Sequence, residues 1–150
     1  MSGSVKTIGL IGLGNAGGPM AQRLLKAGYA LRVFDINPER MADLASQGAI
    51  VGSSPADAVS ETTIVLLPSA VEVRAAVSGK GGVLSGMKPG DILIDLSGTD
   101  PDCARELDDK VSAQSGFFVG GTVHAAGAPA LTIPQGKISL VVGGKKRALD

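Results

Sequence analysis

The stretch GLIGLGNAGGPMAQRL, residues 9–24, decides how this chain is interpreted. Three of its glycines, Gly12, Gly14 and Gly17, have the spacing G-x-G-x-x-G. Such a triplet arises easily by chance in a chain with 22 glycines among 150 residues, so its surroundings must decide what it means. An apolar run of the kind found in buried strands precedes it, and apolar residues at helical spacing follow it.

The rest of the chain continues this alternation of strand and helix. Short apolar runs predict strands at residues 6–14, 30–35, 49–51, 62–68, 91–97, 116–121 and 137–144. Helical spacing, with proline or glycine at several ends, predicts helices at residues 14–29, 38–47, 54–59, 70–77 and 101–114. We expect residues 78–91 to form a loop and residues 122–136 an exposed loop. The alternation predicts an α/β fold with a doubly wound, mostly parallel sheet of the Rossmann type.

In this setting the glycines form a dinucleotide-binding fingerprint. They follow a predicted strand, open a helix, and are followed 18 residues after Gly17 by Asp35 at the end of the next strand. Gly12 permits the tight turn, Gly14 lets the backbone approach a diphosphate, and Gly17 allows close packing of the helix. The amino end of that helix offers free amides and a partial positive charge to phosphates.

Asp35 predicts the type of dinucleotide. Its carboxylate can accept hydrogen bonds from the adenosine ribose hydroxyls and would repel a 2′-phosphate, so we expect NAD(H) rather than NADP(H). Arg40 is close enough in sequence to reach a phosphate, which weakens this preference. The alternative for Asp35 is a polar residue that simply ends a strand.

Several segments together resemble the β-hydroxyacid dehydrogenases, the family of 3-hydroxyisobutyrate dehydrogenase and, more distantly, of 6-phosphogluconate dehydrogenase and the imine reductases. The resemblance rests on IGLIGLGNAGGPMAQRLLKAGY, VFDINPER, TIVLLPSAVEV, GGVLSGMKPGDILIDLSGTDP and ISLVVGG, in the family's order. It implies that Leu67 and Pro68 lie near the nicotinamide ribose and Ser97 near the nicotinamide. The expected cofactor-binding residues are Gly12, Leu13, Gly14, Asn15, Ala16, Gly17, Asp35, Ile36, Leu67, Pro68, Ser97 and Thr99.

The chain departs from the family's pattern at three places. Ala16 replaces a usual methionine, and Gly98 separates Ser97 from a threonine that would normally follow it directly, here Thr99. Where the family commonly has a serine and glycines that hold the substrate's carboxylate, this chain reads GGTVHAAG. His124 and Ala125 are therefore candidate substrate-binding residues, with His124 also able to handle a proton; the alternative is a loop histidine without a role.

The resemblance also implies a catalytic lysine in a helical region that follows residues 1–150. We therefore expect this chain to be the dinucleotide-binding domain of an NAD-dependent oxidoreductase acting on a small 3-hydroxy acid or related carbonyl compound. The family's carboxyl-terminal helical substrate and dimerisation domain is absent from it, no catalytic residue is assigned within it, and the isolated chain should be inactive. The alternatives are a stand-alone nucleotide-binding or redox-sensing module without turnover, or the cofactor domain of an imine reductase.

Composition excludes other classes of protein. The net charge is zero, with 14 basic and 14 acidic residues, and aromatic residues make up 3%, so a nucleic-acid partner is not expected. No apolar run is long enough to cross a bilayer, and the single cysteine favours a reducing compartment, so we expect a cytoplasmic protein without a membrane partner. One histidine without a cluster of other ligands predicts no metal site. The expected partners are a small-molecule substrate and, in the full-length enzyme, further copies of the same chain.

Overall fold

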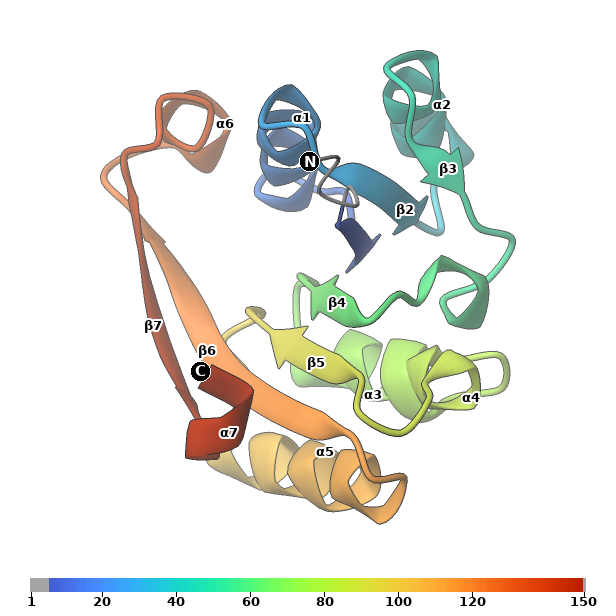
Figure 1. The fold of residues 1–150 in the computed structure, drawn as a ribbon. Helices are drawn as coiled ribbons and strands as arrows, with labels where there is room; N and C mark the ends of the chain where they lie inside the picture. The colour runs from blue at the N-terminus through green and yellow to red at the C-terminus, as the bar shows by residue number, and fades with distance from the viewer. Residues whose placement is uncertain (1–5, 150) are drawn as a thin grey trace, which may run out of the picture.

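One sheet of seven strands organises the part of the chain that the structure, a computed structural model, describes, residues 6–149 (Figure 1). The strand order is β3-β2-β1-β4-β5-β6-β7. The bounds are β1 Thr7–Ile11, β2 Ala30–Phe34, β3 Ile50–Val51, β4 Thr62–Val65, β5 Ile92–Asp95, β6 Phe117–Ala125 and β7 Ile138–Gly144. The first six strands are parallel and β7 is antiparallel to β6. The predicted doubly wound, mostly parallel sheet is therefore confirmed.

Helices cover both faces of this sheet. Their bounds are α1 Gly17–Lys26, α2 Pro38–Ser46, α3 Ala70–Ser78, α4 Val83–Gly86, α5 Pro101–Ala113, α6 Pro129–Thr132 and α7 Lys146–Leu149, with a 3₁₀ turn, η1, at Ala56–Ala58. On one face α3, α4 and α5 bury apolar side chains such as Val77, Val83 and Leu107 against β4 and β5. On the other face α1 and α2 pack Ala21 and Leu44 against β1 and β2.

The strand order reverses direction at β1. The chain passes from β1 outward to β2 and β3, then returns to β4 on the other side of β1. The crevice at this reversal opens beyond the carboxyl ends of β1 and β4, where ligands bind in open α/β sheets. The glycine turn between β1 and α1 lies at this point.

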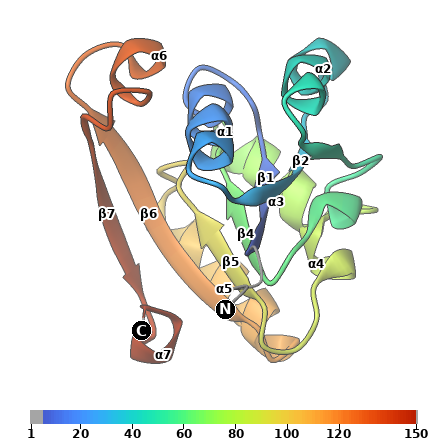
Figure 2. The same ribbon diagram turned by 45° about the horizontal axis from the view of Figure 1, so that its top comes forward.

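The segment of residues 122–136 does not form the exposed loop that the sequence predicted. Its first four residues extend β6 to Ala125, and α6 follows at Pro129–Thr132. Ile133 is fully buried against Met20 and Leu96. Figures 1 and 2 show α6 beside α1, and the Arg23 guanidinium donates a hydrogen bond to the Pro134 carbonyl at 3.0 Å. The exposed-loop prediction was wrong because these apolar residues are covered by elements distant in sequence.

Two smaller predictions also need correction. The predicted loop at residues 78–91 contains the one-turn helix α4, which buries Val83. The strand predicted at residues 62–68 ends at Val65, so Leu67 and Pro68 lie in the connection to α3. The other predicted elements are confirmed within a few residues at their ends.

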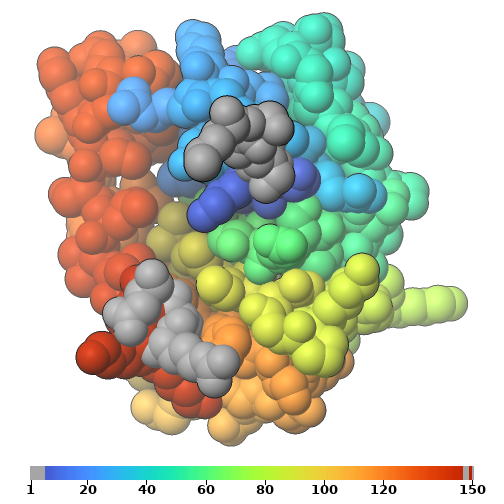
Figure 3. All heavy atoms as spheres, viewed as in Figure 1, coloured from blue at the N-terminus to red at the C-terminus, as the bar shows by residue number. Residues whose placement is uncertain are grey.

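An apolar hollow of about 450 Å³ lies between α1 and β7. In Figure 3 it separates the β7 side of the molecule from α1 and β5. It is lined mainly by apolar side chains, among them Met20, Leu24, Ile94, Leu96, Ile133, Leu140, Val142 and Leu149. Leu140, Val141 and Val142 of the edge strand β7 are exposed. The sheet is therefore less completely covered on this side than elsewhere.

Candidate nucleotide-binding site

The glycine turn between β1 and α1 is tight because two of its positions leave no room for a side chain. Gly12 has φ of +95°, and a Cβ atom there would lie 2.2 Å from the Leu66 carbonyl oxygen. A Cβ atom at Gly17 would lie 1.9 Å from the Gly12 carbonyl oxygen. At Gly14, by contrast, a Cβ atom would meet nothing within 4 Å. The first and third glycines are needed by the fold, whereas the second leaves open space beside the backbone.

Backbone amides line this open space. No hydrogen bond within the described part of the chain uses the amides of Gly14, Asn15, Ala16 or Gly17. Side chains cap the starts of α2, α3 and α5. The N-cap residue of α1, Ala16, provides no side-chain cap, and the first turn of α1 has no acidic residue. The unpaired amides and the positive end of the helix dipole together suit an anionic ligand.

Asp35 is buried at the end of β2 and holds the glycine turn. One of its oxygens accepts a hydrogen bond from the Leu13 amide at 2.7 Å, and the other accepts one from the Asn37 amide at 2.8 Å. The Arg40 guanidinium lies 3.5 Å from the second oxygen. A carboxylate offers about four lone-pair positions, so Asp35 can still accept hydrogen bonds from a ligand. The hydrogen bond to Leu13 was not predicted, because it joins residues 22 positions apart.

A hollow of about 250 Å³, here called the glycine hollow, opens over this turn. Its lining brings together most of the predicted cofactor-binding residues with two further ones: Gly12, Gly14, Asn15, Ala16, Gly17, Asp35, Arg40, Leu66, Leu67 and Pro68. A neighbouring hollow, lined by Leu13 and also by Gly14, Asn15 and Arg40, extends toward Ala130 of α6. Ile36 is 91% exposed and belongs to neither lining.

The residues present fit a dinucleotide. The space beside Gly14 together with the unpaired amides suits a diphosphate, and Asp35 lies at the same edge of the sheet with lone pairs to spare for ribose hydroxyls. Leu67 and Pro68 add an apolar wall on the β4 side. The geometry therefore favours a ligand with an anionic centre and a polar sugar at one end.

Ser97 and Thr99 lie at the carboxyl end of β5, one strand further along. The Ser97 hydroxyl oxygen accepts a hydrogen bond from the Leu67 amide at 2.9 Å, which joins it to the wall of the glycine hollow. The Thr99 hydroxyl donates to Asp95 at 2.8 Å. Sequence reasoning did not single out Asp95, a buried acidic residue at a strand end, because its partners lie in an irregular turn.

His124 lies apart from this group. It is exposed on β6 opposite Ser139 of β7, and with Ala125 and Lys137 it lines a separate shallow hollow that shares no residue with the glycine hollow. Its role in substrate binding remains a prediction, as does that of Ala125.

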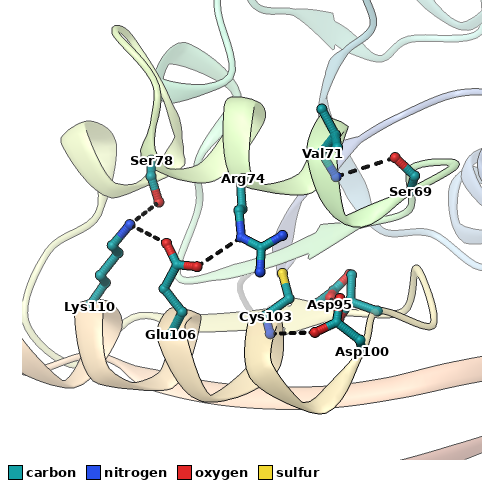
Figure 4. Close-up of polar contacts among 10 residues, drawn as sticks. Ser69, Val71, Arg74, Ser78, Asp95, Asp100, Cys103, Glu106 and Lys110 are labelled. Atoms are coloured by element: carbon teal, nitrogen blue, oxygen red, sulfur yellow. Dashed lines mark hydrogen bonds and ion pairs between the residues drawn. The ribbon is translucent and has the colours of Figure 1, made fainter.

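The α3–α5 interface holds Cys103 and a group of hydrogen-bonded charged side chains (Figure 4). Cys103 is fully buried, and burial raises the pKa of its thiol, so it is not an activated nucleophile. Glu106 of α5 accepts hydrogen bonds from Lys110 and from Arg74 of α3, and these bonds lower the pKa of its carboxyl. No group of three or more potential metal ligands occurs within residues 6–149. This interface is a structural element.

Further charged side chains lie along α5 and directly after β7. Asp108 is partly buried and lies 3.4 Å from the Lys145 ammonium, which also donates to Ser112. Asp109 and Lys146 are exposed. Over the same described residues, no helix is both long and apolar enough to cross a membrane.

Comparison with known proteins agrees with this geometry. Residues 7–150 match the family described as the NAD binding domain of 6-phosphogluconate dehydrogenase. The mitochondrial 3-hydroxyisobutyrate dehydrogenase of Homo sapiens is 36% identical over 139 residues, which are 91% of this chain and 40% of that protein. The 3-sulfolactaldehyde reductase of Escherichia coli (strain K12) is 35% identical over 145 residues, 95% of this chain and 48% of that protein.

Solved structures share the fold. Psf3 in complex with NADP⁺ and 2-OPP superposes with a TM-score of 0.85 at 26% identity, over 94% of this chain and 50% of that one. An imine reductase of Streptomyces aurantiacus superposes with a TM-score of 0.80 at 25% identity, over 97% of this chain and 50% of that one. The chain thus spans between two fifths and a half of the length of these proteins.

Proposed function

Because this chain belongs to the family of NAD-binding domains found in 6-phosphogluconate dehydrogenase and the β-hydroxyacid dehydrogenases, we propose that it binds NAD(H) for an oxidoreductase. That enzyme transfers a hydride between the nicotinamide and a small 3-hydroxy acid or related carbonyl compound. The observation that carries the proposal is the run of four unpaired amides at the start of α1, facing open space beside Gly14, with Asp35 in the same lining.

Different residues contact different parts of the cofactor. The amides of residues 14–17 hold the diphosphate, and Asp35 and Ile36 lie on the adenosine side. Leu67 and Pro68 line the path to the nicotinamide ribose, and Ser97 and Thr99 serve the nicotinamide half. When bound, the nicotinamide supplies the hydride chemistry, while the protein supplies orientation and electrostatics.

We propose NAD(H) over NADP(H) because Asp35 is a buried carboxylate at the ribose end. A 2′-phosphate there would meet like charge. Arg40 opposes this preference, since its half-exposed guanidinium borders both hollows and could pair with a phosphate. Psf3, which shares this fold, was solved with NADP⁺, so a protein of this fold can take the phosphorylated cofactor.

The general acid or base of the reaction lies outside residues 1–150, in a helical substrate and dimerisation domain that follows. Lys145, which directly follows β7, is already paired with Asp108 and Ser112 of α5 and lines neither hollow at the glycine turn. The chain alone therefore binds cofactor without turnover. His124 and Ala125 would contact the substrate when that domain is present.

Two other functions stay open to test. A stand-alone nucleotide-binding or redox-sensing module would bind NAD(H) and need no further domain. The cofactor domain of an imine reductase is favoured by the fold shared with the Streptomyces aurantiacus enzyme and by His124 in place of a carboxylate-holding serine. Asp35 argues against the second, because we expect imine reductases to use NADPH.

The structure also supports proposals about the binding partners of the protein and about its cellular compartment. A small molecule is the expected partner, and the apolar hollow beside β7 supports association between copies in the full-length enzyme. The buried, unpaired Cys103 supports a reducing compartment such as the cytoplasm.

Titration of the chain with NADH and NADPH, followed by an assay for turnover, tests the proposal. We expect NADH to bind about 10-fold tighter than NADPH, the effect of about 1.4 kcal/mol of unfavourable charge at the ribose. Arg40→Gln should weaken NADPH binding and leave NADH binding unchanged. A preference for NADPH would overturn the assignment to NAD, and turnover of roughly 10 per second by the chain alone would show that it contains its own catalytic group.

A further inference from the structure

Asp95 is a buried carboxylate that accepts its hydrogen bonds from a single turn of the chain. It is the last residue of β5, is 1% exposed, and takes part in no ion pair within the described residues. A carboxylate removed from water must be stabilised by hydrogen bonds. One oxygen accepts from the Ser97 amide at 2.9 Å and the other from the Thr99 hydroxyl at 2.8 Å. Both of its oxygens thus help to hold one three-residue turn.

That turn places Ser97 between three strands. Gly98, at the centre of the turn, has φ of +69°, a conformation that glycine adopts without strain. The Ser97 hydroxyl oxygen accepts from the Leu67 amide at the end of β4, and the Ser97 backbone forms an isolated bridge with Thr122 of β6. The hydroxyl is therefore fixed relative to β4, β5 and β6 together.

The direction of the bond from Leu67 determines what Ser97 can offer to a ligand. The amide can only donate, so the serine oxygen accepts, and its hydroxyl hydrogen remains to be donated. No hydrogen bond donated by the Ser97 hydroxyl occurs among the described residues. Since Leu67 lines the glycine hollow, this unused donor lies at its border, at the carboxyl edge of the sheet.

We propose that Asp95 is a positioning residue that presents the Ser97 hydroxyl as a hydrogen-bond donor to the nicotinamide half of the cofactor. The inference rests on the proposed function. Its acceptor is the carboxamide oxygen of the nicotinamide. Asp95 does not touch the cofactor; it acts through the turn that carries Ser97.

The test compares two ligands that share the adenosine diphosphate part. NADH contains the nicotinamide and ADP-ribose does not, so the ratio of their affinities isolates the nicotinamide. Ser97→Ala and Asp95→Ala should each lower this ratio roughly 10-fold, the usual effect of one hydrogen bond. Asp95→Asn should keep a ratio near that of the original chain, because its amide can still accept from the Ser97 amide and donate to the Thr99 oxygen.

Asp91→Ala is the matched control. Asp91 is a buried aspartate next to the opposite end of the same strand, where it accepts a hydrogen bond from the Lys88 amide. Its removal should lower stability without changing the affinity ratio. If Asp95→Ala does not fold, Thr99→Val decides instead, since it removes one partner of Asp95 from the turn. It should lower the ratio in the original chain but not further in Ser97→Ala, whereas a direct contact of Thr99 with the cofactor would lower the ratio in both.

The outcomes separate this inference from the function on which it rests. Failure of ADP-ribose to bind the original chain would contradict the proposed function. Binding of ADP-ribose with a ratio unchanged by Ser97→Ala and by the folded Asp95 or Thr99 variant would overturn the inference alone. An equal loss of both ligands in Asp95→Ala would show that Asp95 has only a structural role, and would also overturn it.

Discussion

At Gly14 the space beside the backbone is open, whereas at Gly17 it is filled by the carbonyl of Gly12. Within one motif, therefore, Gly17 is required by the fold, whereas Gly14 leaves space that we assign to the ligand. A methyl group at Gly14 meets no protein atom but enters the space that a diphosphate requires. A methyl group at Gly17 would displace the main chain at Gly12, whether or not a ligand is present.

We predict that Gly14→Ala leaves the thermal unfolding temperature unchanged and weakens NADH binding about 10-fold or more. Gly17→Ala should lower the unfolding temperature itself. Differential scanning fluorimetry and calorimetric titration measure the two effects. Gly143→Ala on β7, where a Cβ atom would also meet nothing within 4 Å, is the control and should change neither. Equal NADH affinity in Gly14→Ala and the original chain would contradict the assignment of this space to a ligand.

At the scale of elements, the segment that contains α6 is held to α1 by one buried apolar side chain and by the hydrogen bond from Arg23 to the Pro134 carbonyl. Ile133, which follows α6 directly, is fully buried against α1 and the end of β5, while Leu131 within α6 is 67% exposed. We predict that Ile133→Ala lowers the free energy of unfolding by about 3 kcal/mol, as expected for a truncated buried isoleucine. Leu131→Ala should change it by less than about 0.5 kcal/mol. Urea unfolding measures both, and similar small effects for the two variants would mean that residues 126–136 are a loose loop.

The α3–α5 interface should make stability depend on pH. Hydrogen bonds from Lys110 and Arg74 lower the pKa of Glu106 in the folded protein from its ordinary value of 4.5. A lowered pKa means that the ionised form stabilises the fold at neutral pH, and that this stabilisation is lost as the pH falls through the folded-state pKa. We predict that Glu106→Gln flattens the fall in unfolding free energy between neutral pH and the acid range.

Asp109→Asn is the control for this experiment. Asp109 is an exposed acid on the same helix and forms no ion pair among the described residues. Urea unfolding at a series of pH values should give a curve for Asp109→Asn parallel to that of the original chain. If the curve for Glu106→Gln is parallel as well, the hydrogen bonds across the interface contribute nothing to acid stability.

At the scale of the whole molecule, the sequence was sufficient for the topology, because alternating strands and helices leave few ways to form a parallel sheet. It was insufficient where burial depends on distant partners. Ile133 is covered by Met20, which no local periodicity indicates. The hydrogen bond from the Leu13 amide to Asp35, and the turn that Asp95 holds, likewise need the fold to bring the partners together. Motifs placed the candidate site, and tertiary contacts supplied the residues that shape it.

The central claim is that the backbone amides at the start of α1 bind the diphosphate of NAD(H). The most direct test is a titration of the ¹⁵N-labelled chain with NADH, followed by two-dimensional amide NMR spectra. We predict that the amide signals of Gly14, Asn15, Ala16 and Gly17 shift most and saturate together with a single dissociation constant. The amide signals of the glycines near Lys80, which also lie in a glycine-rich segment, should not shift. Unchanged signals at residues 14–17 in the presence of excess NADH would contradict the account.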